Sequence, residues 1–209
     1  RTQNGQFLIP MTDNHHRLGE VIEASTTEFT SQSYDLYDAP PLGTLVRCGG
    51  ESETGVVYGI VFEVATRSLD STRRPIARGR DEDSEAAIYE ENPQLNRLLT
   101  TEFRAQTVGH RDHETLRRWL APLPPRIHSF VLPCHGDEWR EFAGSLEFVS
   151  ILLSAPTAAT DDVLASFLRR ASVSYPDPES FLIRAGRQLT PLLGDQLQRL
   201  NNILRRLSP

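Results

Sequence analysis

The segment VVYGIVFEVATRS, residues 56–68, constrains the fold of this chain more than any other. It is rich in Val, Ile, Phe and Tyr, which pack well on the pleated surface of a sheet. Gly59 interrupts the run, and a glycine inside a strand is typical of a bulge or a sharp bend. Small closed barrels need such bends, so we expect a β-barrel in this half of the chain.

Shorter strand-like segments surround this run, with turn residues between them. Residues 27–35 alternate, with Phe29, Ser31 and Ser33 on one side and Glu28, Thr30, Gln32 and Tyr34 on the other. Phe29 should face the core, and the run of Ser, Thr and Gln should face solvent or a partner. An acidic cluster followed by a short helical pattern predicts a helical excursion at 83–99, ended by Pro93. The barrel should therefore span residues 16–110, after a flexible segment at 1–15. Its expected strands are 18–25, 27–35, 43–48, 56–66 and 102–109.

The second half of the chain, residues 111–209, has mainly helical patterns. Asp112 can cap a helix at 113–120, and residues 127–132 resemble a strand. From residue 137 an apolar residue recurs every three or four positions, which indicates one amphipathic helix along Trp139, Phe142, Leu146, Val149 and Leu153. Further helix starts are expected at Thr160, at Asp177 with Pro178, and at Thr190 with Pro191. The fold class is therefore α+β, with an N-terminal small β-barrel followed by a mainly helical region.

Composition excludes several kinds of chemistry. All 22 basic residues are Arg, so the chain can form neither a Walker A loop nor a lysine Schiff base. The net charge of −6 argues against broad nucleic-acid binding, although residues 161–209 carry seven Arg against five acidic residues. The longest apolar run, FVSILL at 148–153, is too short to span a bilayer, so no membrane insertion is expected. Two cysteines form no disulfide framework, which favours a cytoplasmic location.

The N-terminal half resembles the HAS-barrel, which HerA-type DNA-translocating ATPases share with the catalytic subunits of ATP synthase. The resemblance lies in LGEVIEASTTEFTSQSYD, PLGTLVRC and TGVVYGIVFEVAT, within residues 17–110. Gly19 precedes an apolar pair, Leu42 and Gly43 turn into a strand, and Gly59 interrupts the next one. In HerA-type proteins a P-loop ATPase core follows this barrel, whereas a helix-rich region without Walker A follows here. Motor activity therefore does not carry over.

What the resemblance implies is a barrel of the kind that packs side by side in hexameric rings and docks partners such as a nuclease. We therefore expect a non-catalytic assembly or adaptor module that needs no cofactor. It would be a ring component, a homo-oligomer, or a protein partner of a HerA-type DNA-processing ATPase or nuclease.

A charged stretch between two expected strands is the candidate partner-binding surface. It contains four arginines followed directly by an acidic run. Pairing between these opposite charges on an exposed loop is one alternative. Contact between copies is the other, since charge pairs set register and partner choice. The residues are Arg73, Arg74, Arg78, Arg80, Asp81 and Asp83.

A second hypothesis makes the protein a nucleic-acid-binding protein. Arg199, Arg205 and Arg206 fall largely outside the leucine stripe of the last helix. They could contact phosphates or a partner. The alternative is a solvated helix face with cations near the C-terminal end of the helix dipole.

A third hypothesis is a Cys/His hydrolase or a metal-binding enzyme. Cys134 and His135 adjoin an expected helix start, where a thiol pKa can fall, but neighbouring residues usually point apart. His110, Asp112 and His113 are metal-ligand types, yet their spacing fits no strong zinc signature. The competing interpretations are a buried apolar cysteine and a helix cap at Asp112.

Overall fold

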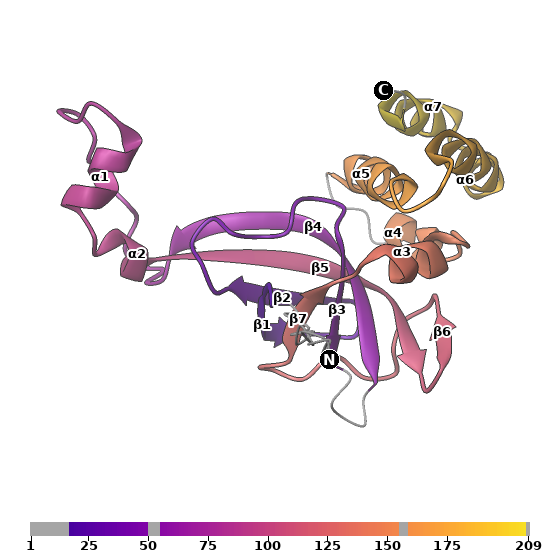
Figure 1. Cartoon of the computed structure of the whole chain (residues 1–209), viewed down its shortest axis with the longest axis horizontal. Helices are drawn as coiled ribbons and strands as arrows, with labels where there is room; N and C mark the ends of the chain where they lie inside the picture. Colours follow the sequence, from indigo (N-terminus) through magenta and orange to yellow (C-terminus); the bar gives the residue numbers. More distant parts are fainter. Residues whose placement is uncertain (1–16, 50–54, 155–158, 208–209) are drawn as a thin grey trace, which may run out of the picture.

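Six antiparallel strands close a barrel in the computed structural model, which describes residues 17–49, 55–154 and 159–207 (Figure 1). Their order is β2-β1-β7-β3-β4-β5, and the pairing of β2 with β5 closes the ring. A short strand, β6, pairs with the other edge of β5. The strands are β1 (Gly19–Ala24), β2 (Glu28–Ser33), β3 (Leu45–Gly49), β4 (Val56–Ser68), β5 (Leu99–Asp112), β6 (Thr115–Arg117) and β7 (Phe130–Pro133). The predicted α+β class with an N-terminal barrel is confirmed.

The alternation predicted for β2 determines which residues enter the barrel. Phe29 is buried in the interior, as expected. Ser31 and Ser33 lie on the same face and are also buried, so the prediction that the whole polar run faces outward was wrong. Because side chains alternate along a strand, only Glu28, Thr30 and Gln32 remain partly exposed.

Gly59 has the role that the sequence predicted. The pairing of β4 with β5 shifts register between Tyr58 and Gly59, which marks a bulge. A Cβ atom at Gly59 would lie 2.7 Å from the ring of Phe29 inside the barrel. The glycine therefore allows the bend and also makes room for the Phe29 ring in the interior.

The sheet continues past residue 110, where the sequence placed the end of the barrel. β7 lies between β1 and β3 and completes the ring. The helix predicted at 113–120 does not form, and Asp112 is no helix cap. Asp112 pairs with Thr115 in a hairpin whose turn includes His113, with a φ of 51°. After β5 the chain becomes helical only from Gly136.

Beyond the barrel, β4 and β5 continue as a two-stranded ribbon that carries residues 69–98. We call residues 69–98 the arm. It holds α1 (Glu85–Glu91) and α2 (Leu95–Leu98), so the predicted helical excursion forms as two short helices. Ser84 caps α1 by accepting a hydrogen bond from the backbone N–H of Ala87. Figure 1 shows the arm standing away from the rest of the chain.

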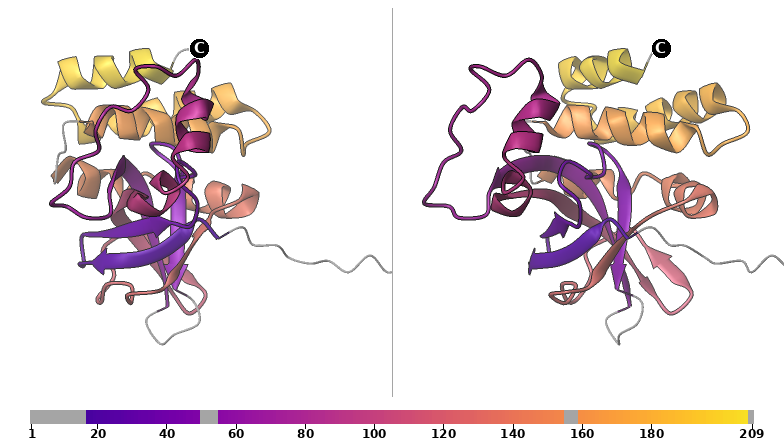
Figure 2. Two further views of the ribbon diagram at one scale, coloured as in Figure 1. Left: turned by 90° about the vertical axis from the view of Figure 1, so that its left-hand side faces the viewer. Right: turned by 60° about the vertical axis from the view of Figure 1, so that its left-hand side comes forward.

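In the described residues, helices α3 to α7 form a layer over one side of the barrel (Figure 2). Asp177 and Pro178 begin α6 as predicted, with Asp177 accepting from the N–H of Ser180. Two other predictions were wrong: the stripe from Trp139 divides into two helices, and Pro191 lies inside a helix instead of starting one. The helices are α3 (Gly136–Ala143), α4 (Val149–Ser154), α5 (Thr160–Ser172), α6 (Pro178–Leu192) and α7 (Leu197–Leu207).

The barrel and the helical layer share one hydrophobic core. The side chains of Leu45, Tyr58 and Ile60 extend from the outer face of the barrel and pack against the buried aromatic residues of the helices. Phe167 of α5 sits centrally among these rings, with centroids 5.0 Å from Phe148 and 5.2 Å from Trp139. Burial of so many aromatic rings contributes strongly to stability, so the two parts should unfold together.

Candidate functional site

The environment of Cys134 does not favour a nucleophilic thiol. The residue is 4% exposed and belongs to the core between the barrel and the helices. Burial, followed by the charge of Glu138, raises the pKa of the Cys134 thiol well above its usual value. The backbone N–H of His135 donates to the carboxylate of Glu138 at the start of α3. Cys134 thus contributes as a small apolar residue, and His135 marks the start of a helix.

Both thiols should resist modification in the folded protein. Burial raises the pKa of Cys48 to about 12, and Cys134 is shifted in the same direction. Since the thiolate is the reactive form, we expect a disulfide reagent at pH 8 to react on the order of 10³-fold more slowly than with a free thiol. The absorbance of the released reagent group should show that two thiols per chain have reacted only after denaturant is added. Rapid release of one equivalent from native protein would contradict this assignment.

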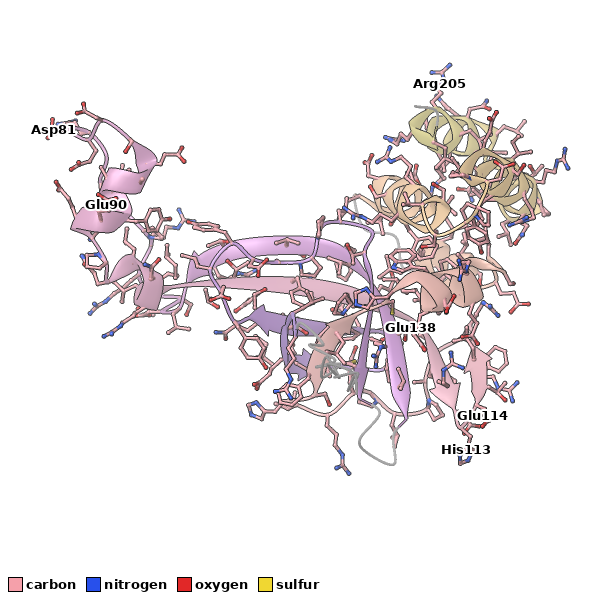
Figure 3. The ribbon with its side chains drawn as sticks, in the orientation of Figure 1. Asp81, Glu90, His113, Glu114, Glu138 and Arg205 are labelled. Atoms are coloured by element: carbon pink, nitrogen blue, oxygen red, sulfur yellow. The ribbon has the colours of Figure 1, made fainter. Side chains whose placement is uncertain are left out.

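The candidate metal ligands do not converge. His110 is turned toward the backbone, with Nδ1 3.2 Å from the carbonyl oxygen of Trp119. Asp112 and His113 lie at the exposed tip of the hairpin, where Figure 3 labels His113. His128 contacts Glu20 instead, at 3.0 Å. Within the described ranges no three such side chains are placed to hold a metal ion, while His15 and His16 lie outside those ranges.

The C-terminal arginines mostly bind the neighbouring helix. Arg199 Nε lies 2.5 Å from Asp161 Oδ1, and Arg206 Nε lies 2.8 Å from Asp162 Oδ1. Both carboxylates belong to the first turn of α5, so these pairs fix α7 against α5. Arg205 remains exposed at the outer edge of α7 (Figure 3). A surface with two of its three cations already paired is a weak phosphate-binding site.

The arm holds the predicted charged stretch, and no ion pair joins its arginines to the acidic run among the described residues. Among the described arm residues, Arg73 forms an ion pair with Asp70, with Nε 3.5 Å from Oδ2. Arg78 donates to the side-chain oxygen of Asn92 at 3.0 Å. Arg74, Arg80, Asp81 and Asp83 extend from the arm without an ion pair in this part of the chain. Their charges are available to another molecule.

The acidic side of the arm carries repelling carboxylates. The pKa of Glu82 is raised, chiefly by a hydrogen bond with Glu91 and further by burial and by the charge of Glu91. Such crowding of like charges is unfavourable in the free protein. A cationic partner would relieve it. Figure 3 shows Asp81 and Glu90 at the far end of the arm.

The base of the arm contains a pocket that the sequence did not predict. Tyr37 holds the arm through its hydroxyl contact with Tyr89, and its backbone N–H donates to Thr101 Oγ1 at 2.8 Å. The pocket has a volume of about 770 Å³. Its lining includes Tyr37, Ile76, Arg78, Ile88, Tyr89 and Leu99. The available signal was an aromatic residue in a polar turn, at Tyr37.

A second hollow, which we call the groove, lies among α5, α6 and α7. It has a volume of about 900 Å³. Leu182, Ile183, Leu204 and Leu207 supply its apolar lining. Arg169, Arg187 and Glu179 are the charged residues around it. The sequence offered only a faint signal, an apolar pair on α6 beside the buried stripe.

None of the helices in the described ranges is both long and apolar enough to cross a bilayer. Comparison of the sequence with known protein families and with curated proteins finds no match.

Proposed function

We propose that this protein is a non-catalytic assembly module of the cytoplasm that binds protein partners through its arm. On this proposal it is a ring component or an adaptor for a HerA-type DNA-processing ATPase or nuclease. The HAS-barrel resemblance supplies the class of partner, and the closed six-stranded barrel is compatible with it. The chain has no Lys for a P-loop, so nucleotide hydrolysis would belong to the partner.

The exposed arm is the observation that carries this proposal. α1 and α2 bury none of their side chains, although they contain Ile88 and Leu95. Leu69, Ile76 and Leu98 are exposed on the same arm. Apolar side chains beside unpaired charges are typical of a surface that a partner covers. A projection of this kind adds little to the stability of its own chain, so its value lies in contacts with other molecules.

Removal of the arm tests this function. Ser68 and Leu99 face each other in the register of β4 and β5, so an Asn-Gly turn can replace residues 69–98. We expect the armless variant to unfold in one cooperative transition with the melting temperature of the whole protein, and to lose only the circular dichroism signal of α1 and α2. It should lose the partners, or the self-association through the arm, that native mass spectrometry detects after affinity purification from the source cell.

A substitution at a different exposed tip is the matched control. His113→Gly changes the β5–β6 hairpin, where the backbone already has a positive φ, and should leave every association intact. Equal recovery of partners with and without the arm would overturn the proposal. So would a wild-type chain that stays monomeric and captures no partner.

A further inference from the structure

We infer that this chain forms a symmetric dimer in which the α6 helices of two copies pack antiparallel along the groove. The inference goes beyond the proposed function, because α6 lies on the side of the chain away from the arm (Figure 1). It depends on one row of α6 side chains that is complementary to itself. The row has an acidic residue at one end, a basic residue at the other and an exposed apolar residue between them.

The row consists of Glu179, Ile183 and Arg187, which all line the groove. Residues four apart lie on the same face of a helix, with Cβ atoms about 5–6 Å apart. Ile183 is 51% exposed, although its side chain is aliphatic. Glu179 and Arg187 are exposed on either side of it, about 12 Å apart along the helix, too far to pair with each other. Neither side chain forms a hydrogen bond or ion pair with any residue that the structure describes.

A two-fold axis beside Ile183 brings opposite charges together. In an antiparallel pair of α6 helices, Glu179 of each copy faces Arg187 of the other, and the two Ile183 side chains meet near the axis. Packing between rows of residues four apart is the commonest way in which helices cross in globular proteins. Because the order of acidic, apolar and basic residues is complementary to its own reverse, the occupant that fits this groove is a second copy of the chain.

The rest of the groove extends the apolar centre of this contact. Leu182 and Leu204 line it beside the row. Gly186 lies between them, where a Cβ atom would be 3.2 Å from Leu204 Cδ2. Since Gly186 has no side chain, Ile183 of a second copy can approach the junction of α6 and α7. Burial of these aliphatic groups would supply affinity, and the two ion pairs would fix the antiparallel orientation.

Two other arginines near the row are held within their own chain. Arg169 lines the groove but donates to a backbone carbonyl oxygen of α7 and to a serine of α5. Arg184 is absent from the lining, and its guanidinium carbon lies 5.5 Å from the ring centroid of Tyr175. Arg187 is therefore the groove cation that is left for the acidic residue of a second copy.

Charge reversal at either end of the row tests the contact. Glu179→Arg places basic residues opposite each other in the homodimer, and Arg187→Glu places acidic residues opposite each other. By sedimentation velocity, each variant should dimerise at least tenfold more weakly than the wild type, and so should Ile183→Asp. All three residues are exposed, so the variants should fold, which thermal unfolding will verify. Arg205→Glu changes an exposed α7 arginine outside the groove and, as the matched control, should dimerise like the wild type.

Mixing the two charge-reversed variants is the decisive step. One copy then supplies two basic residues and the other supplies two acidic residues, so both ends of the row again join opposite charges. The mixture should therefore form a 1:1 heterodimer about as tightly as the wild type forms its homodimer. The double variant Glu179→Arg with Arg187→Glu should likewise recover dimerisation with itself. Raised sodium chloride should weaken these dimers, since the ion pairs are exposed at the edge of the contact.

Other outcomes overturn the inference and leave the proposed function to be decided separately. A monomeric wild-type chain ends it, while the armless variant still shows whether the arm binds other proteins. Charge-reversed variants that fail to pair when mixed, or a dimer that tolerates Ile183→Asp, exclude the antiparallel α6 contact. Variants that lose a captured protein instead of a dimer assign the groove to that protein. A dimer that disappears with the arm assigns self-association to the arm, whereas a dimer that survives its removal supports the α6 contact.

Discussion

Phe167→Ala should lower the free energy of unfolding by about 3–5 kcal/mol, the loss typical of a large cavity in a packed core. Phe167 is fully buried in α5 and packs against Trp139, Phe142 and Phe148. The same core includes residues from the outer face of the barrel. The cavity would therefore weaken the contact between the barrel and the helical layer, as well as the layer itself. Chemical denaturation followed by circular dichroism measures the change.

Val173→Ala is the control for this substitution. Val173 follows α5 directly and is 80% exposed, so its truncation should change stability by no more than about 0.5 kcal/mol. Barrel and helical layer should also unfold in one transition, whether far-ultraviolet or tryptophan signals are followed. A loss below about 1 kcal/mol for Phe167→Ala, or two separate transitions in the wild type, would show that the shared core does not hold the two parts together.

Local patterns predicted most of the barrel because its strands have strong two-residue periodicity. Phe29 was placed in the interior and Gly59 at a bulge, and both predictions are confirmed. The position of β7 between β1 and β3 was not predictable in the same way. Val131 of β7 pairs with Gly19 and Cys48, which lie far away in the sequence. No local pattern encodes which distant strand will occupy that position.

The errors in the helical region also have a physical origin. A polar segment after Asp112 fits a capped helix as well as it fits a hairpin, and pairing with β5 decides for the hairpin. Pro191 looked like a helix start, yet it lies in the last turn of α6. Leu189 and Leu193 are both buried around it, so tertiary packing keeps that turn helical despite the lost backbone donor.

The sequence identified the charged residues of the candidate sites, but not the residues with which they form ion pairs. The arginines of α7 were noticed, but their ion pairs with Asp161 and Asp162 depend on how α5 and α7 pack. The charged residues of the arm were also found, because a run of charged residues can be recognised in the sequence without knowing the fold. The groove was missed because three helices contribute to it, and none of them shows a hollow surface alone.

Gly43→Ala should destabilise the protein by about 2–4 kcal/mol, although it adds a single methyl group. Gly43 has a φ of +76°, a conformation that costs other residues energy. Its N–H donates to the carbonyl oxygen of Val61 at 2.8 Å, which fixes the turn on the barrel. A Cβ atom there would lie 2.6 Å from the backbone nitrogen of Phe167. Because that neighbour is backbone, α5 would have to move away from the barrel.

Gly136→Ala separates this clash from the general effect of adding a methyl group. Gly136 begins α3 without a positive φ, and a Cβ atom there would meet nothing within 4 Å. Alanine should leave stability unchanged or raise it by up to about 1 kcal/mol, because it restricts the unfolded chain. The denaturant midpoint should therefore fall for Gly43→Ala and stay the same or rise for Gly136→Ala. Similar midpoints would contradict both the strained backbone at Gly43 and its close approach to α5.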